Sequence, residues 1–151
     1  MARMDYITSS LSDWKTIFGF NITIKVRFSE TDMFGHMNNT VPFTYFEEAR
    51  IEFFKSLGFM QEWTNTENET IPVVADLQCD YLKQVYFDEY IRIYVKAASI
   101  GRSSVDLHYM GVDANDEICF TGRNSLVNMS KKTGKSVEWN SEWKNKLEFK
   151  V

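Results

Sequence analysis

One change of hydrophobic period constrains the fold of this chain more than any other feature. Over residues 21–28 apolar side chains occupy every second position, which is the period of a half-buried strand. Over residues 40–57 they recur every three or four positions, which is typical of a helix. The first set is Ile22, Ile24, Val26 and Phe28, and the second is Phe43, Phe46, Ala49, Phe53 and Leu57. Because Gly58 is a natural helix stop, the sequence predicts one strand followed directly by one long helix.

The rest of the chain predicts a sheet large enough to cover this helix. At about 1.5 Å per residue the helix is roughly 25 Å long, and its broad apolar face needs a partner of similar size. Segments rich in β-branched and aromatic residues, separated by turn signals, provide that partner. They span residues 73–86, 90–98, 104–112 and 118–129. This order predicts an α+β fold with the helix packed on one face of a curved antiparallel sheet.

Composition narrows the class of protein. A chain of 151 residues suits one folded unit, and its formal net charge of -4 disfavours a general nucleic-acid-binding protein. No apolar run approaches the roughly 20 residues that span a bilayer, and the first residues lack the apolar stretch of a signal peptide. We therefore expect a cytoplasmic protein without a membrane partner. The widely spaced Cys79 and Cys119 are expected to be reduced thiols.

The two ends of the chain are expected to lie outside the main domain. We place that domain at residues 21–130, with an N-terminal extension over 1–20 and a C-terminal extension over 131–151. Each extension contains a candidate short helix, in SLSDWKTIFG and in SEWKNKLEF, with a serine that can cap it.

The segment SETDMFGHMNN, residues 29–39, joins the predicted strand to the predicted helix and gathers the polar groups of interest. A local role is available to each of them. Asp32 can end the strand as an Asx turn, and Asn38, Asn39 or Thr40 can cap the helix, with Pro42 in its first turn. The residue types alone therefore leave a turn role and a catalytic role open.

The segment VRFSETDMFGHMNN, followed by YFEEARIEFF, resembles the signature of hotdog-fold acyl-CoA thioesterases of the 4-hydroxybenzoyl-CoA thioesterase type. The resemblance extends from about Ile22 to Met129, because IPVVADLQCDYLKQVYFDEYIRIYV and IGRSSVDLHYMG stand where that family has its second to fourth strands. It implies a hotdog fold, in which about five antiparallel strands wrap the central helix. It also implies a homodimer or a dimer of dimers, with sheets joined edge to edge and active sites at the interface.

The resemblance further implies hydrolysis of an acyl-CoA or acyl-carrier-protein thioester, without a cofactor or a metal ion. A free thiol has a pKa near 8.5, so a thiolate leaves without strong acid help, and a carboxylate with oxyanion donors can suffice. By its place in the DxxGH motif, Asp32 would be the nucleophile or the general base. His36 would orient or polarise the thioester, and Asn38 and Asn39 would face it. Gly35 lets the backbone turn tightly.

Other residues are weaker candidates for substrate binding. Glu47 lies near the apolar face of the predicted helix. The resemblance indicates backbone amides around Val73 and Val74 as oxyanion donors, and the turn at Arg102, Ser103 and Ser104 as the contact for the coenzyme A phosphates. Arg123, Lys131 and Lys132 are alternative phosphate contacts. The family usually has tyrosine at the position of Pro42, which leaves the identity of the acyl group open.

Two other functions remain as alternatives. A hotdog protein can bind acyl-CoA without turnover, although the intact Asp32 favours a hydrolase. A hotdog dehydratase is disfavoured because the HFPGxP-like segment of one such group is absent. His108 stands in an alternating strand and lacks a third residue at zinc spacing, so we expect it to be a face residue rather than a metal ligand.

Overall fold

The computed structural model describes residues 4–148 of the chain. The helices are α1 (Leu11–Thr16), the 3-10 turn η1 (Phe28–Glu30), α2 (Val41–Ser56), α3 (Phe59–Trp63) and α4 (Ser141–Glu148). The strands are β1 (Phe20–Lys25), β2 (Thr70–Val74), β3 (Gln78–Tyr81), β4 (Tyr90–Ile100), β5 (Ser104–Val112) and β6 (Ile118–Ser130).

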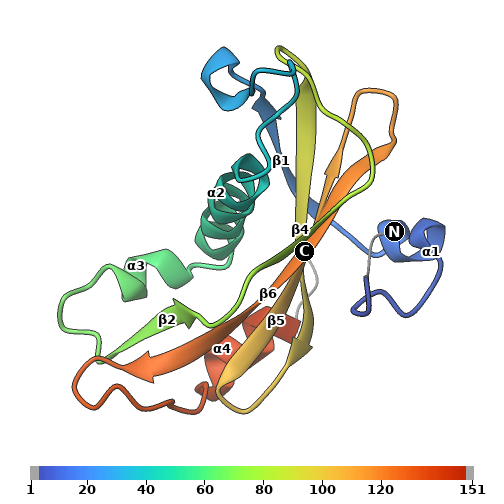
Figure 1. Cartoon of the computed structure of the whole chain (residues 1–151). Helices are drawn as coiled ribbons and strands as arrows, with labels where there is room; N and C mark the ends of the chain where they lie inside the picture. The colour runs from blue at the N-terminus through green and yellow to red at the C-terminus, as the bar shows by residue number, and fades with distance from the viewer. Residues whose placement is uncertain (1–3, 149–151) are drawn as a thin grey trace.

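A curved antiparallel sheet lies against one side of α2 (Figure 1). The strand order is β1-β4-β5-β6-β2, and β3 pairs with the part of β6 that β2 leaves free. At the centre of the contact the ring of Phe46 stacks on Tyr109 of β5, with 4.5 Å between the ring centroids. The predicted α+β arrangement, a helix wrapped by an antiparallel sheet, is confirmed.

The long helix begins and ends where the sequence indicates. Pro42 lies in the first turn, where its missing amide donor is not needed. Gly58 follows the last turn with φ +84° and donates its amide to the carbonyl of Lys55 at 3.0 Å. A left-handed residue at this position satisfies a carbonyl that the helix leaves open, and glycine adopts it without strain.

The expected strand over residues 73–86 is wrong in extent, because the chain forms two shorter strands there. Asp76 interrupts the ladder, since its Oδ1 accepts the backbone amide of Ser125 at 2.7 Å in place of a main-chain carbonyl. After Tyr81 the amides of Leu82 and Lys83 both donate to the carbonyl of Cys119, and residues 82–89 leave the sheet. Within the described residues 4–148 the sheet therefore has six strands, where about five were expected.

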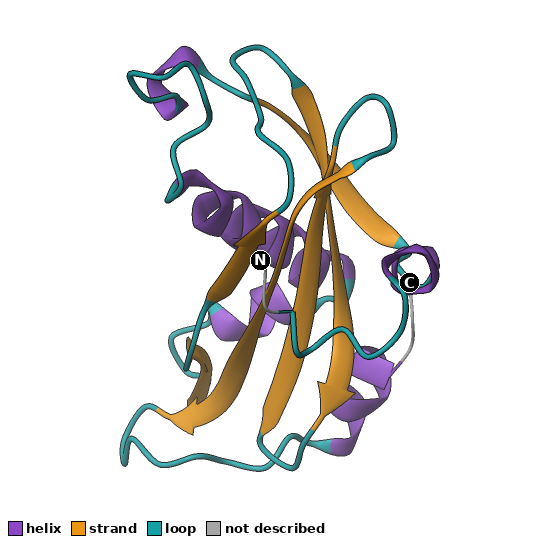
Figure 2. Ribbon diagram, turned by 45° about the vertical axis from the view of Figure 1, so that its right-hand side comes forward, coloured by secondary structure: helices purple, strands orange, loops and turns teal. Residues whose placement is uncertain are grey.

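The N-terminal segment covers the opposite face of the sheet from α2. Figure 2 shows helices on both sides of the strands. On α1, Trp14 is only 3% exposed and packs with Met110 and Val112, which alternate along β5 with the α2-facing Tyr109. Of the two serine caps expected at the terminal helices, the one at α1 is confirmed, because the hydroxyl of Ser10 accepts the amide of Asp13 at 3.1 Å. The one at α4 is wrong, because Oδ1 of Asn140 accepts the amide of Trp143 at 2.8 Å and Ser141 already lies in the helix.

The C-terminal helix α4 joins the main core. Trp143 lies 5.7 Å from Phe59 and 5.8 Å from Trp63, measured between ring centroids. Leu147, one turn later, is also buried in that core. Both predicted terminal helices therefore form, and each buries a tryptophan.

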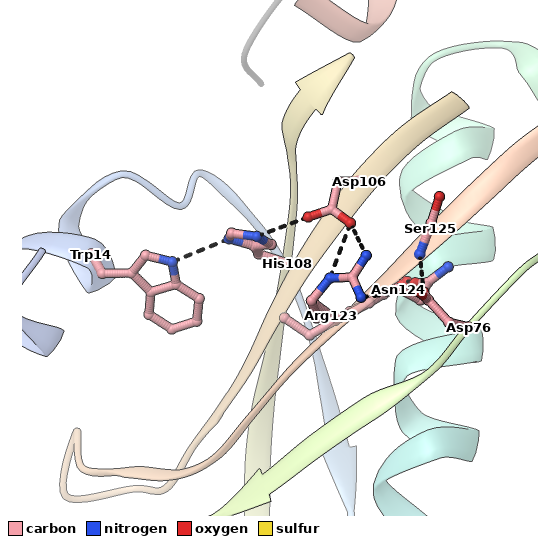
Figure 3. A network of polar contacts seen from close by, with 8 residues as sticks. Trp14, Asp76, Asp106, His108, Arg123, Asn124 and Ser125 are labelled. Carbon is pink, nitrogen blue, oxygen red and sulfur yellow. Dashed lines mark hydrogen bonds and ion pairs between the residues drawn. The ribbon is translucent and has the colours of Figure 1, made fainter. Parts of the chain in front are cut away.

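A chain of polar contacts crosses the sheet face under α1 (Figure 3). The indole Nε1 of Trp14 donates to Nδ1 of His108 at 3.3 Å, and Nε2 of His108 lies 3.2 Å from Asp106. Arg123 then bridges Asp106 and Asp76, with Nε 3.0 Å from the first and Nη1 3.0 Å from the second. His108 is a buried face residue, as expected from the sequence, although its partner Trp14 was not foreseen.

His108 should make the stability of the protein depend on pH. Burial lowers its pKa from 6.5 to about 4, although Asp106 acts in the opposite direction. Between these two values the unfolded chain binds a proton that the folded chain refuses, so the free energy of unfolding falls as the pH drops. We expect a loss on the order of 2–3 kcal/mol between pH 6.5 and pH 4 from this residue.

Urea denaturation of the wild type and His108→Gln at intervals across this pH range measures the effect. The variant should be less stable at neutral pH, but its stability should depend less steeply on pH than that of the wild type. Parallel curves for the two proteins would contradict the assignment, because carboxylates titrate in both and cancel in the comparison.

Candidate functional site

The loop between η1 and α2 is closed by its own backbone. The amide of Asp32 donates to the carbonyl of His36 at 2.8 Å, and the amide of Gly35 donates to the carbonyl of Asp32 at 3.1 Å. Gly35 has φ +82°, a conformation that other residues rarely adopt, so glycine permits the tight turn expected from the sequence. The amide of Met37 then donates to Val85 at 2.7 Å and fixes the loop to the segment after β3.

This loop holds the carboxylate of Asp32 in one orientation. Oδ1 accepts the amides of Phe34 at 2.8 Å and His36 at 3.3 Å, which is an Asx turn. Within residues 4–148, Oδ2 accepts no hydrogen bond, and the side chain is exposed. One oxygen is therefore anchored while the other is free to meet a water molecule or a ligand. The turn role and a chemical role for Asp32 are compatible.

Asp32 lies at the edge of a cavity of about 210 Å³ beside the start of α2. His36 and Asn39 contribute polar groups to the same cavity. Its apolar part includes the buried side chains of Val85 and Phe120, which are 2% and 1% exposed. A carboxylate and an imidazole thus share a cavity that has both a polar and an apolar part.

The imidazole of His36 is positioned by packing. Its ring meets Tyr86 edge to face, with 5.3 Å between centroids. Neither ring nitrogen forms a hydrogen bond within the described part of the chain, so both are available to a ligand.

Three polar residues that line the cavity were missed by sequence reasoning. Tyr81 donates its hydroxyl to the backbone carbonyl of Asn39, and Gln84 accepts the hydroxyl of Tyr86 at 3.0 Å. Lys83 pairs with Asp113 at 2.6 Å, and this contact is the largest cause of the raised pKa of its ammonium group. No spacing in the sequence indicates them, because the fold brings residues 81–85 to the loop from a distant segment.

A fourth missed residue is Glu30, which joins the loop to α2. Its Oε1 accepts the amide of Arg27 at 2.8 Å and the hydroxyl of Tyr45 at 2.9 Å. Tyr45 is 1% exposed, and burial together with this carboxylate raises the pKa of its hydroxyl. Its position two residues before Asp32 in SETD is the only sequence signal. Glu30 fixes the distance between the loop and the helix.

The Thioesterase-like superfamily model matches residues 26–147, which includes this cavity and most of the sheet. The chain belongs to the thioesterase-like superfamily. The uncharacterized protein YsmA of Bacillus subtilis is 51% identical over 142 residues, which cover 94% of each chain. The acyl-CoA thioesterase YbgC of Haemophilus influenzae is 24% identical over 87 residues, covering 58% of this chain and 64% of that protein.

A solved structure agrees with this membership. The chain is similar to a predicted thioesterase from Bacillus stearothermophilus, with a TM-score of 0.77 and 30% identity. The match covers 87% of this chain and 96% of that one. The resemblance to the hotdog-fold thioesterases and the hotdog fold itself are confirmed.

In this thioesterase-like chain, the remaining candidates before and within α2 do not all line the Asp32 cavity. Asn39 lines the cavity, whereas Asn38 turns its Oδ1 to the amide and hydroxyl of Thr40, both at 3.2 Å. Thr40, at the cap position, makes no side-chain cap hydrogen bond. Glu47 is exposed on α2 and does not line the cavity. Only Asn39 of these three candidates lies with Asp32 and His36 in one chain.

The other candidates lie outside this cavity. Val73 and Val74 of β2 are 37% and 38% exposed. Arg102 is 82% exposed and lies 3.4 Å from Glu138. In the same turn, the carbonyls of Ser103 and Ser104 accept hydrogen bonds from Asn128 and Trp139. A single thioesterase-like chain does not bring these residues to Asp32, so their roles stay predictions that involve a partner.

Two features of residues 4–148 bear on the class of site. No helix there has both the length and the apolar character needed to cross a membrane. No group of three or more His, Cys, Asp or Glu side chains is arranged there to hold a metal ion. Among the described residues, His108 of β5 contacts one carboxylate, that of Asp106, and two aromatic side chains, those of Trp14 and Tyr6.

Proposed function

We propose that this protein hydrolyses an acyl-CoA or acyl-carrier-protein thioester to the free acid and the thiol. The observation that carries the proposal is the carboxylate of Asp32, with Oδ1 held by two amides and Oδ2 free, beside His36 in one cavity. Membership of the thioesterase-like superfamily supports the reaction, and the acyl-CoA thioesterase relative supports the substrate class.

Two routes are open to the free Oδ2 of Asp32. It can attack the thioester carbonyl carbon, so that the C–S bond breaks, the thiolate leaves, and water hydrolyses the resulting anhydride. Alternatively it takes a proton from the water molecule that attacks the same carbon. His36 and Asn39 are placed to orient the substrate from the same cavity. The anchored Oδ1 keeps the carboxylate oriented before substrate arrives, which lowers the entropic cost of either route.

The site is proposed to be completed in a homodimer, or in a dimer of dimers. The amide of Ala75, just after β2, donates to the carbonyl of Ser125 on β6. Asn128 of β6 stands opposite Pro72, but its amide points away from β2 and donates to the carbonyl of Ser103. By the alternation of an antiparallel ladder, Pro72 and Val74 therefore direct their backbone groups to the free edge of β2. A free edge with exposed valines favours pairing with another strand, and a second copy offers the same edge.

Pairing at this edge supports roles for the residues that lie outside the cavity. A cavity of about 210 Å³ is smaller than the 300–1,000 Å³ that small-molecule sites usually have, which favours an added wall from a second copy. Backbone amides around Val73 and Val74 are our candidates for the oxyanion donors, and Glu47 is a candidate contact at the same interface. Arg102, Ser103 and Ser104 remain candidates for the coenzyme A phosphates. We place the reaction in the cytoplasm.

The proposal is tested by thiol release from a panel of short, long and aromatic acyl-CoAs, with a thiol-reactive dye as the readout. Selective turnover of one class is expected, because an apolar cavity wall discriminates acyl groups by size. If calorimetry shows that acyl-CoA binds but no member of the panel releases thiol, the protein is a non-catalytic acyl-CoA-binding protein and the proposed hydrolysis is wrong. Carrier-protein thioesters form the second arm of the same assay.

A further inference from the structure

The Asp32 cavity changes in character between its mouth and its inner end. At the mouth, Asp32 and Asn39 are exposed and contribute polar groups. At the inner end, Val85 and Phe120 line the same cavity, although they are only 2% and 1% exposed. A thioester with its carbonyl carbon beside Asp32 would therefore direct its acyl group inward, because apolar carbon atoms gain free energy by leaving water.

The ring of Phe120 is held in place at this inner end. In the pairing of β5 with β6, Phe120 stands opposite Gly111, and a Cβ atom added to Gly111 would clash with Cζ of the ring. The tip of the ring therefore occupies the space that a side chain at position 111 would fill. Phe46 of α2 packs against the same ring, with 5.7 Å between the centroids. Phe120 is thus confined between a strand and a helix, and close packing keeps it from swinging away from the cavity.

Tyr81 bounds the cavity on the side of β3. It is the register partner of Phe120 in the pairing of β3 with β6, so the two side chains lie on the same face of the sheet. Its hydroxyl donates to the backbone carbonyl of Asn39 and connects β3 to the segment before α2. Tyr81 and Phe120 therefore form a continuous aromatic boundary across two strands.

The depth of the cavity is set within one chain. A second copy can add a wall only where side chains are accessible, and Val85 and Phe120 are already almost fully buried. Phe46, which packs against Phe120, is itself fully buried and stacked on Tyr109. A partner can therefore extend the mouth of the cavity, whereas its inner end cannot lengthen without displacing the core.

We propose that this cavity takes a short acyl group and that Phe120 sets the limit on its length. The inference rests on the proposed thioester hydrolysis and adds the substrate class to it. Each methylene group beyond the limit must displace the ring of Phe120 or remain in water, and neither gives favourable burial. A long chain would then hold its carbonyl carbon away from the free Oδ2 of Asp32, which lowers kcat/KM.

The kcat/KM values for straight-chain substrates from acetyl-CoA to dodecanoyl-CoA test this limit. We expect the wild type to hydrolyse butyryl-CoA or hexanoyl-CoA at least about tenfold more efficiently than dodecanoyl-CoA. Phe120→Leu removes ring atoms at the inner end, so the ratio of the dodecanoyl to the butyryl value should rise at least about tenfold. The matched control is Phe59→Leu, which makes the same change in the core away from the cavity and should leave this ratio within about twofold of the wild type.

Thermal unfolding of both variants shows whether they fold. If Phe120→Leu does not fold, Phe120→Met replaces it, because the flexible methionine side chain can fill the core and still bend away from a ligand. The same ratio in the folded Phe120 variant and in the wild type would overturn the role of Phe120. A wild type that prefers dodecanoyl-CoA would overturn the short acyl group.

Both of these contrary results include thiol release, so they leave the proposed hydrolysis intact. Release from no acyl-CoA and from no carrier-protein thioester would instead contradict the hydrolysis, and the inference would fail with it. If only carrier-protein thioesters are hydrolysed, the same acyl series and the same variants are compared on the carrier protein.

Discussion

Replacing Asp32 by Asn should lower kcat/KM for thioester hydrolysis at least about 100-fold while leaving the fold intact. The asparagine Oδ1 can still accept the amides of Phe34 and His36, so the loop keeps its turn. Its amide nitrogen replaces the free Oδ2, however, and can neither attack a carbonyl carbon nor take a proton from water. The measurement is the initial rate of thiol release from the best substrate of the panel, together with the melting temperature.

Two companion variants separate chemistry from structure. Glu48→Gln removes a carboxylate from the exposed side of α2 and should leave the rate within about twofold of the wild type. Asp32→Ala removes both the free oxygen and the anchored one, so it should lose activity and also loosen the loop. A rate for Asp32→Asn within about threefold of the wild type would show that another group activates the nucleophile.

Much of the fold was predictable because its signals are local. The three-to-four-residue period and Gly58 define α2, and the alternating segments define β4 to β6 to within about two residues. The break between β2 and β3 was not predictable in this way. It depends on the contact between Asp76 and Ser125, which are 49 residues apart. Trp14 and His108, which are 94 residues apart, were likewise not foreseeable as partners.

In the candidate site, too, the residues that are close in sequence were predictable and those brought together by the fold were not. Asp32, His36 and Asn39 are close in sequence, so one motif identifies all three before the fold is known. Tyr81 and Phe120 enter the same cavity only because β3 pairs with β6 and places them opposite each other. Such registers are set by packing over the whole sheet, and no single segment encodes them.

A large effect on stability is expected at Gly122 of β6, which lies directly against the ring of Phe46 of α2. A Cβ atom added there would lie 2.3 Å from the ring of Phe46 and 2.8 Å from the backbone carbonyl of Gln78. The ring cannot move aside easily, because it is fully buried and stacked on Tyr109. Gly122→Ala should therefore cost about 3 kcal/mol, or roughly 6–12 °C in melting temperature. Thermal unfolding followed by circular dichroism measures this.

A second substitution tests whether the Phe46 ring is the cause. Phe46→Leu removes the ring atoms nearest to the added Cβ, at the cost of a poorer fit against Tyr109. In that background Gly122→Ala should cost at least about 1 kcal/mol less than in the wild type, which a double-mutant cycle detects. Additive losses would place the strain at the Gln78 carbonyl and hence in the pairing of β3 with β6. A coupled result would instead show that the missing side chain at Gly122 makes room for the Phe46 ring of α2, which no hydrophobic pattern in the sequence reveals.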